Sequence, residues 1–459
     1  MLILIFLFIF NLSLAQSLVS SSPIDFHKES VYKLAGNQST YFLLKEKFNA
    51  FALIKFNDSL QIIQKREFKT NFQLTETLYF FYKGDDLHLI CTGNKWNQGQ
   101  LRYIQFSSTL QVKKDTLLYQ CPKGILSDQI YSSISDNKER LLIYLKKNSK
   151  IQEYSSFHFS ANELHAQKIN FDIQSELISG LISNSGIIYF VSELNYQFRK
   201  KKDHKIEIYK IQEKEIQKLI IPAYHLSFID SKYIYDEINN QLIGLNLYSK
   251  NSSETQGILY FRTQFNDSTV NSSIDFDDTY IRNLTGDKKK KVYGIPNLEI
   301  KDLILRKDGG VLLVTEQNLK YETNDLSSTF GFNSTLKQTD FLFENLAIVN
   351  IHPSGQVHWK QVIYKNQLSE NDQGRYSSFT MMKSNANIYV LFNEEIKWGS
   401  PMVSYELNTL GELKKNKLFE RSVLDLMPEF ANAIQISLNS VLTCQYKHHK
   451  LKLIKLTLQ

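Results

Sequence analysis

The chain has 459 residues, of which 42% are hydrophobic and 22% charged, and its 54 basic and 47 acidic residues give a net charge of +7. The longest basic runs, 200–202 and 288–291, are short, whereas nucleic-acid binding needs a larger, clustered basic excess with interleaved aromatic residues. Three cysteines cannot form a disulfide framework, and their spacing does not fit a zinc site.

The first fifteen residues, Met1–Ala15, predict a signal peptide. An apolar run, Leu2–Phe10, leads to Ser13-Leu14-Ala15, whose small residues favour cleavage before Gln16. The run is shorter than the roughly 20 apolar residues of a membrane-spanning helix, and no later segment is apolar enough to span. No Lys or Arg precedes it, so an uncleaved or buried N-terminal strand is the alternative. We expect export to the periplasm, the cell surface or the medium.

Residues 16–459 predict a single all-β domain. Strand-sized runs rich in Tyr, Phe, Ile, Leu and Val alternate with turns of Asn, Asp, Ser, Gly and Lys, and no linker interrupts them. Helical periodicity is nearly absent, and Val423–Ala433 is the best helical candidate.

One type of hairpin recurs along the chain. Successive turns lie 50 to 55 residues apart, except for a gap of 88 residues after Asn266. These turns are at Asp58, Ser108, Ala161, Glu213, Asn266, Ser354 and Thr409. A second series interleaves with the first, at Asn37, Asp85, Asp136, Ser185, Asn239, Asp308, Asn385 and Asn439. Each repeat therefore holds four strands, a to d, which is the size of a β-propeller blade.

The repeats predict a β-propeller of four-stranded blades, most simply with eight blades. Seven complete sets precede a last set with only three strands, and Leu18–Phe26 can supply the missing outer strand. A seven-bladed propeller and a pair of β-sandwiches are the alternatives.

Loop lengths predict which face carries function. The a–b and c–d turns are short, whereas long segments join b to c and d to a. Long ordered loops in compact domains are usually functional. The b–c loops are 92–100, 194–205, 318–345 and 394–400, and the d–a loops are 275–297, 365–375 and 421–432.

This loop face supplies the candidate binding residues. Aromatic rings and carboxylates suit a sugar or a peptide, through ring stacking and charge-assisted hydrogen bonds. The alternative is that the rings only pack the loops onto the blades. The candidates are Trp96, Glu193, Tyr196, Phe198, Tyr280, Glu316, Tyr321, Phe330, Phe332, Glu394, Glu395 and Trp398.

The sequence predicts no catalytic residues, no cofactor and no metal site. It lacks the GxSxG, HExxH, P-loop and Rossmann patterns. The acidic run 275–278 does not continue as a calcium loop, and we interpret it as a solvated loop. Cys91, Cys121 and Cys444 lie in or beside strand-like runs and are expected to be buried thiols, with a Cys91–Cys121 disulfide as the alternative.

Several segments of the second half resemble a family of uncharacterised exported bacterial propeller proteins. They are Ile234–Ser249, Leu303–Gln317, Trp359–Gln367, Tyr376–Phe379 and Val390–Glu395, which cover about a third of the chain. The resemblance implies a propeller fold and export, and it carries no functional residues.

The leading functional hypothesis is an exported, monomeric, non-enzymatic binding or scaffold protein of the cell envelope, whose partner is an envelope protein or a glycan. The alternative is a glycan-active hydrolase or lyase. It would use loop carboxylates, with Glu193, Glu316, Glu394 and Glu395 as candidates, at the spacing of about 5 to 9.5 Å that glycosidases need.

Overall fold

A computed structural model gives the structure of the protein. It describes residues 17–27, 31–47, 49–147, 150–161, 163–168, 175–194, 203–213, 215–251, 253–265, 269–286, 293–327, 334–397, 400–419 and 426–458. The predicted signal peptide lies outside these residues.

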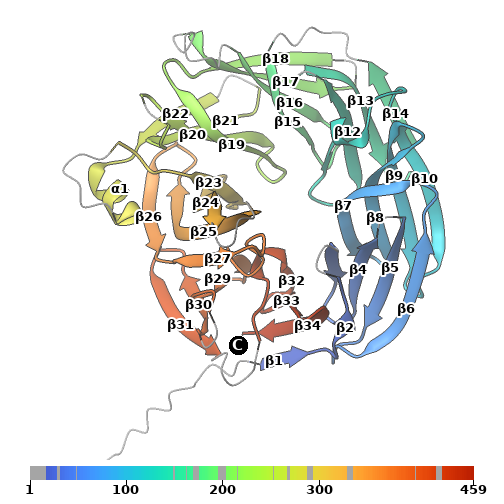
Figure 1. The fold of residues 1–459 in the computed structure, drawn as a ribbon. Coiled ribbons are helices and arrows are strands. Elements are labelled where there is room, and N and C mark those ends of the chain that lie inside the picture. The colour runs from blue at the N-terminus through green and yellow to red at the C-terminus, as the bar shows by residue number, and fades with distance from the viewer. Residues whose placement is uncertain are drawn as a thin grey trace, which may run out of the picture. The chain divides into compact units, whose positions relative to one another are not determined.

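The described chain is almost entirely β-structure. It forms eight antiparallel sheets. Seven contain four consecutive strands, one of these with the short strand β27 added, and the eighth contains three consecutive strands completed by two short N-terminal strands. This is the architecture of an eight-bladed β-propeller, as the repeats predict (Figure 1). The chain divides into two compact units. The first contains Met1–Glu46, Ala52–Glu67 and Arg375–Gln459, and the second contains Lys47–Phe51 and Phe68–Gly374. That residues 16–459 form one domain stays a prediction.

Three sheets belong mainly to the first unit. One contains β3 (Tyr32–Gly36), β4 (Tyr41–Lys47), β5 (Ala50–Phe56) and β6 (Ile62–Lys69). Another contains β28 (Thr380–Lys383), β29 (Ile388–Asn393), β30 (Met402–Leu407) and β31 (Leu413–Phe419). The third contains β32 (Ile434–Ser437), β33 (Ser440–Lys447) and β34 (Lys450–Thr457), together with β1 (Ser17–Ser20) and β2 (Ile24–Asp25).

Five sheets belong to the second unit, and each runs from strand a to strand d. The first two contain β7 (Gln73–Lys83), β8 (Asp86–Lys95), β9 (Gln98–Ser107) and β10 (Val112–Gln120), and β11 (Ile130–Ile134), β12 (Arg140–Lys147), β13 (Lys150–His158) and β14 (Glu163–Lys168). The next two contain β15 (Glu176–Ile182), β16 (Ile188–Leu194), β17 (Lys205–Gln212) and β18 (Glu215–Pro222), and β19 (Ser227–Asp236), β20 (Gln241–Ser249), β21 (Gly257–Thr263) and β22 (Thr269–Asp275). The last contains β23 (Leu298–Leu305), β24 (Val311–Ser327), β25 (Ser334–Ile351) and β26 (Val357–Ile363), and β27 (Gln367–Glu370) pairs with β25 in the same sheet.

Side-chain burial follows the position of a strand in its blade. Every residue of the inner strand β20 is buried, and so are six of the seven in β16. In contrast, the outermost strand β22 alternates between exposed and partly buried residues. Strands covered on both faces are therefore buried along their length, whereas the outermost strand has one solvated face and alternates.

An N-terminal strand completes the last sheet. Residues 17–20 of β1 pair with residues 457–454 of β34, and β2 pairs with the start of the same strand. The prediction that Leu18–Phe26 supplies the missing outer strand is confirmed. The pairing covers the outer edge of β34, which would otherwise offer unpaired amide and carbonyl groups to other chains.

The helix prediction was wrong. Within Val423–Ala433 the described part contains only a 3-10 turn, Phe430–Asn432, and residues 421–425 lie outside the described range. Among the described residues the α-helix is α1 (Asp278–Thr285), which begins in the acidic run 275–278 that the sequence predicts as a solvated loop. The Asp277 side chain accepts a hydrogen bond from the Tyr280 amide at 2.8 Å, and Gly286 ends the helix with φ 68°. Asp277 is therefore the N-cap of α1, and Gly286 is its C-cap.

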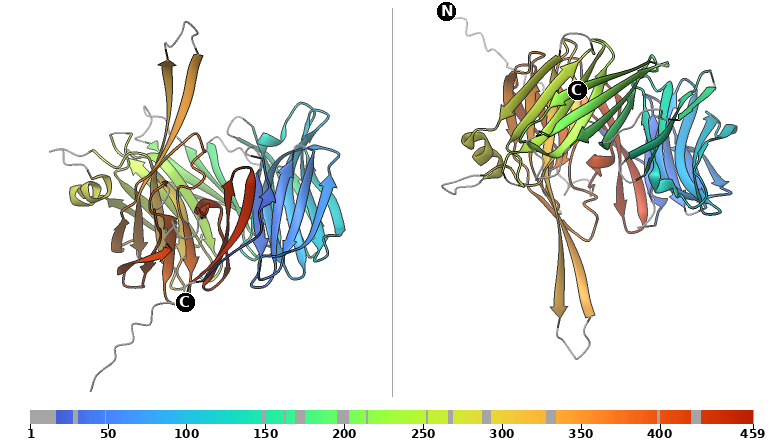
Figure 2. Two further views of the ribbon diagram at one scale, coloured as in Figure 1. Left: turned by 60° about the horizontal axis from the view of Figure 1, so that its bottom comes forward. Right: turned by 90° about the horizontal axis from the view of Figure 1, so that it is seen from above.

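Two predicted b–c loops are not loops. Strands β8 and β9 continue to Lys95 and from Gln98, so a two-residue turn at Trp96 and Asn97 joins them, with positive φ at both. The segment 318–345 belongs largely to β24 and β25, which form a hairpin that projects well beyond the other strands of its sheet (Figure 2). The loop prediction for 92–100 and 318–345 is wrong because the polar residues of both segments lie mainly on strands.

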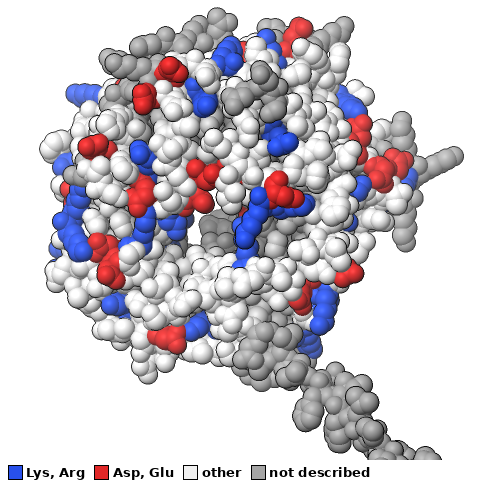
Figure 3. All heavy atoms as spheres, turned by 180° about the vertical axis from the view of Figure 1, so that it is seen from behind, with Lys and Arg blue, Asp and Glu red and all other residues white. Residues whose placement is uncertain are grey.

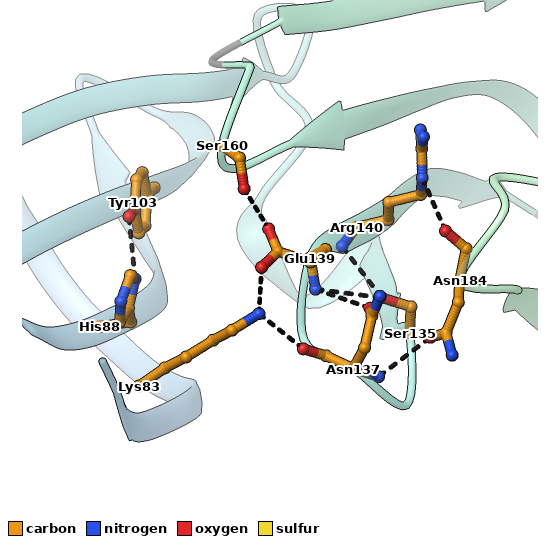
Figure 4. A network of polar contacts seen from close by, with 9 residues as sticks. All are labelled: Lys83, His88, Tyr103, Ser135, Asn137, Glu139, Arg140, Ser160 and Asn184. Carbon is orange, nitrogen blue, oxygen red and sulfur yellow. Dashed lines mark hydrogen bonds and ion pairs between the residues drawn. The ribbon is translucent and has the colours of Figure 1, made fainter.

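The a–b turns of the second unit are hydrogen-bonded in series. Lys83 Nζ donates to the Asn137 carbonyl at 2.7 Å, and the Asn137 amide donates to Asn184 Oδ1 at 2.9 Å (Figure 4). The Asn184 amide then donates to Glu237, and Asn239 Nδ2 donates to the Lys307 carbonyl. Polar groups at the a–b turns therefore connect the five blades of this unit through four successive links.

Glu139 strengthens the first of these links. Its carboxylate accepts hydrogen bonds from Lys83 and Ser160, as Figure 4 shows. The hydrogen bond from Lys83 holds the pKa of Glu139 below its usual value.

Three further observations bear on the sequence expectations. All three cysteines are buried free thiols, so the disulfide alternative is excluded. Among the described residues no helix has the length and apolar character to cross a membrane. Basic and acidic side chains are interspersed over the face drawn in Figure 3, in keeping with the dispersed charge of the sequence.

Candidate functional site

Seven of the twelve predicted binding residues fall within the described chain. Trp96 lies in the β8–β9 turn, Glu193 at the end of β16, and Tyr280 in α1. Glu316 and Tyr321 lie in β24, and Glu394 and Glu395 follow β29. The remaining candidates, Tyr196, Phe198, Phe330, Phe332 and Trp398, lie outside the described residues.

The two described aromatic candidates outside the β24–β25 hairpin differ in exposure. Trp96 is 85% exposed, with Lys95 Nζ 4.8 Å from its ring centroid. Tyr280 is 7% exposed and packs in the core beside Phe276, with Lys360 over its ring. Its ring holds α1 against the blade, so the packing alternative applies to this residue.

Each of the four candidate carboxylates has a basic partner. Glu193 Oε2 lies 3.5 Å from His204 Nε2, and the Nδ1 of this buried histidine donates to the Leu226 carbonyl at 2.8 Å. In the first unit, Glu394 pairs with Lys415 and Glu395 with Lys397. The two lysines neutralise Glu394 and Glu395, and His204 lies beside Glu193.

Glu316 belongs to a fully buried ion pair at the base of the β24–β25 hairpin. Its Oε1 lies 2.8 Å from Lys365 Nζ, and both side chains have zero exposure. Lys301 approaches the other carboxylate oxygen at 3.6 Å, and Lys365 also donates to Gln367 Oε1 at 3.0 Å. Burial lowers the pKa of Lys365, while Glu316 opposes this effect. The pair ties the start of β27 to strand β24.

Beyond this pair, three strands form a projecting element that we call the arm: residues 318–327 of β24, residues 334–343 of β25, and β27. Continuous antiparallel pairing runs from Asn318↔Phe343 to Ser327↔Ser334. Strand β27 pairs with β25 from Phe343↔Gln367 to Asp340↔Glu370. Residues directly opposite each other in such pairs point to the same side of the sheet, so the register assigns side chains to the two faces of the arm.

One face of the arm is packed by the chain itself. It carries Phe341 and Phe343, and Lys301 and Lys365 lie over the Phe343 ring, with Nζ 5.9 and 5.7 Å from its centroid. Gly374 lies so close that an added Cβ would sit 2.7 Å from this ring. The aromatic residues of this face are therefore partly covered by the chain itself.

The other face, which we call the open face, carries apolar residues towards solvent. Leu319, Leu342 and Leu368 lie opposite one another across the three strands. Tyr321 is two residues further along β24 and is 46% exposed, while Leu368 is 52% exposed. Leucine side chains aligned on an exposed sheet face are typical of a surface that is covered by a partner.

Two carboxylates border this apolar row. Asp340 and Glu370 lie opposite each other, and Asp340 also lies opposite Tyr321. Gln338 Nε2 donates to Asp340 Oδ1 at 2.8 Å, and no described cation pairs with either carboxylate. The open face therefore combines an apolar row with a negative end.

Sequence analysis missed a buried carboxyl group in the first unit. Glu429 is 1% exposed, and its Oε2 accepts from the Tyr32 hydroxyl at 2.7 Å. Its Oε1 lies 3.8 Å from Arg375 Nη1, and the Arg375 guanidinium stacks over the Tyr446 ring at 4.5 Å. Burial raises the pKa of Glu429, although Tyr32 and Arg375 oppose the shift. An acidic residue between Pro428 and Phe430 was the available signal.

Comparison with known proteins finds only distant structural similarity. No protein-family model and no curated protein matches the chain, so the family resemblance stays an expectation. The polysaccharide lyase Uly1 is 10% identical, over 85% of this chain and 92% of its own, with a TM-score of 0.41. An oligogalacturonate lyase in complex with manganese is 9% identical over 96% and 98%, with a TM-score of 0.41. The β-propeller domain of the Trilobed protease from Pyrococcus furiosus is 10% identical over 85% and 98%, with a TM-score of 0.39. At such low similarity none of their activities is transferred to this chain.

Proposed function

We propose that the chain is an exported, non-enzymatic binding protein that holds a partner polypeptide of the cell envelope on the open face of its arm. The observation that carries the proposal is the row of Leu319, Leu342 and Leu368, the first two partly exposed and the third 52% exposed, on strands that extend beyond their blade (Figure 2). Ordering this projection has an entropic cost, which contacts with a partner would offset.

The chemistry of the open face defines the partner. Apolar side chains would cover the leucine row, and a Lys or Arg beside them would meet Asp340 and Glu370, which lie opposite each other. A polypeptide with apolar residues flanked by basic ones satisfies both requirements. The row is flat and aliphatic, which suits side chains of a protein better than the hydroxyl groups of a glycan.

The enzyme alternative has weaker support. Glu193, Glu316, Glu394 and Glu395 each have a basic partner, and Glu316 is completely buried. Glu429 has the raised pKa expected of a general acid, but at 1% exposure it does not reach a substrate.

A site-specific photo-crosslinker at position 368 tests the proposal in the producing organism. The matched control carries the crosslinker at Ile220, which is 46% exposed on the outer strand β18. We expect position 368 to capture one protein through a segment with apolar and basic residues, and Ile220 not to capture it. The double variant Asp340→Lys/Glu370→Lys should abolish capture.

Two outcomes would contradict the proposal. One is capture of the same proteins from both positions, and the other is capture only of a second copy of this chain. The same experiment reports export, because N-terminal sequencing of the isolated protein should begin at Gln16, where the signal peptide is expected to end.

A further inference from the structure

A second feature lies among the a–b turns of the first unit, in the sheets formed by β3–β6, β28–β31 and β32–β34. The β3–β4, β28–β29 and β32–β33 turns surround an open depression of about 540 Å³. This volume falls within the range of about 300–1,000 Å³ that is typical of small-ligand sites.

The same turns in the second unit behave differently. There, polar groups of neighbouring a–b turns bind one another, from Lys83 and Asn137 to Asn239 and Lys307. In the first unit, the Gln435 side chain makes such a link to the Lys383 backbone, whereas Gln38, Asn385 and Asn439 line the depression. Within the described chain nothing hydrogen-bonds the side-chain amides of Gln38 and Asn385, or the Nδ2 of Asn439, whose Oδ1 accepts from Ser437 and Ser440. These amides are available to a ligand.

The other lining groups have complementary properties. Ser384 Oγ donates to the Asn387 carbonyl and Ser437 Oγ to Asn439 Oδ1. Each hydroxyl oxygen also accepts from a backbone amide, that of Asn387 or Asn439, so one acceptor position remains on each. The Tyr389 hydroxyl donates to Glu406 at 3.4 Å, which orients the ring in the wall of the depression. No residue of the lining is charged.

From this lining we infer that the depression is a binding site for a neutral saccharide. An amide side chain can donate to one ring hydroxyl and accept from its neighbour, and three of them surround the space. The Tyr389 ring and Leu438, which is 55% exposed, supply apolar surface for the C–H groups of a sugar ring. The absence of charged groups in this lining disfavours uronic acids and phosphates.

The experiment measures binding to the purified chain 16–459. Saturation-transfer NMR and calorimetry would be run with maltotriose, cellotriose, mannotriose and triacetylchitotriose, and with trigalacturonate as the charged comparator. The test variant is Asn385→Ala/Asn439→Ala, at two exposed turn positions. The matched control is Asn366→Ala, which is equally exposed but lies between β26 and β27.

We expect at least one neutral trisaccharide to bind saturably. The double variant should weaken its affinity by roughly thirtyfold, since two lost hydrogen bonds cost about 1 kcal/mol each, and Asn366→Ala should leave it unchanged. The inference is overturned if no neutral trisaccharide binds, if the double variant binds as well as the parent, or if trigalacturonate binds best. The Asp340→Lys/Glu370→Lys arm variant should bind the saccharide normally, so failure here and failure of the proposed function are distinguishable.

Discussion

Lys365 and Glu316 form a completely buried ion pair, with 2.8 Å between the ammonium nitrogen and the nearer carboxylate oxygen. The pair connects the segment that leads into β27 with strand β24, so it sets where the third strand of the arm begins. A buried ion pair of this kind fixes geometry more than it adds stability, because the desolvation of both charges offsets their attraction.

Removing one partner of this pair should destabilise the protein strongly. Lys365→Met leaves the Glu316 carboxylate buried, with Lys301 at 3.6 Å as the remaining cation, and we expect the free energy of unfolding to fall by about 3 kcal/mol. Urea denaturation followed by tryptophan fluorescence measures the change. The double variant Lys365→Met/Glu316→Gln should recover part of the loss.

The matched control for this prediction is Lys415→Met, which breaks the partly exposed pair with Glu394. It should change stability by no more than about 1 kcal/mol. Equal losses in Lys365→Met and Lys415→Met would show that burial does not govern the energetics of these pairs.

Glu429 should make stability depend on pH. Its folded-state pKa is raised above the usual value of 4.5, so the folded protein binds the proton more tightly than the unfolded chain does. Stability should therefore fall as the pH rises from about 4.5 through the folded-state pKa, and then level off. Glu429→Gln keeps an acceptor for Tyr32 and removes the titration. The difference in unfolding free energy between the parent and this variant, measured from pH 4 to 8, should follow that profile, and a difference independent of pH would contradict it.

Close packing of backbone makes Gly99 sensitive to substitution. An added Cβ would lie 2.5 Å from the Ser127 amide nitrogen and 2.6 Å from the Leu126 carbonyl carbon, so the 3-10 turn Ser127–Gln129 would have to move. Gly99→Ala should lower the free energy of unfolding by roughly 1–3 kcal/mol, the usual cost of overpacking. Gly84→Asn is the control, because that turn position has open space and a φ of 60°. Similar thermal shifts in the two variants would argue against the backbone contact.

The sequence predicts the regular part of this molecule well. Turn residues at intervals of 50 to 55 positions, with apolar strands between them, specify eight four-stranded sheets, and Leu18–Phe26 was recognisable as the closing segment. Both patterns arise from local chemistry, namely side-chain alternation and turn preference. The helix α1 was missed because the capping role of Asp277 depends on a single hydrogen bond to the Tyr280 amide.

The candidate site was less predictable for a physical reason. Glu316 was identified from its place near the end of an apolar strand, but its partner Lys365 lies 49 positions later and meets it only through the fold. Leu319, Leu342 and Leu368 form one row through the register of three strands, whereas the sequence predicts a loop between 318 and 345. Contacts between distant segments carry little local signal.

The closing strand gives the last prediction. A chain that begins at His27 lacks β1 and β2, so the outer edge of β34 loses its pairing along residues 450–451 and 454–457. It also loses the buried Phe26 ring, which packs edge-on against Tyr32 and Tyr446. An uncovered strand edge favours pairing between chains, so we expect a lower melting temperature and concentration-dependent association, measured by calorimetry and light scattering. Adding a synthetic peptide of residues 16–27 should reverse both effects, whereas a peptide with Ile24 and Phe26 replaced by Asp should not, because these two side chains enter the core.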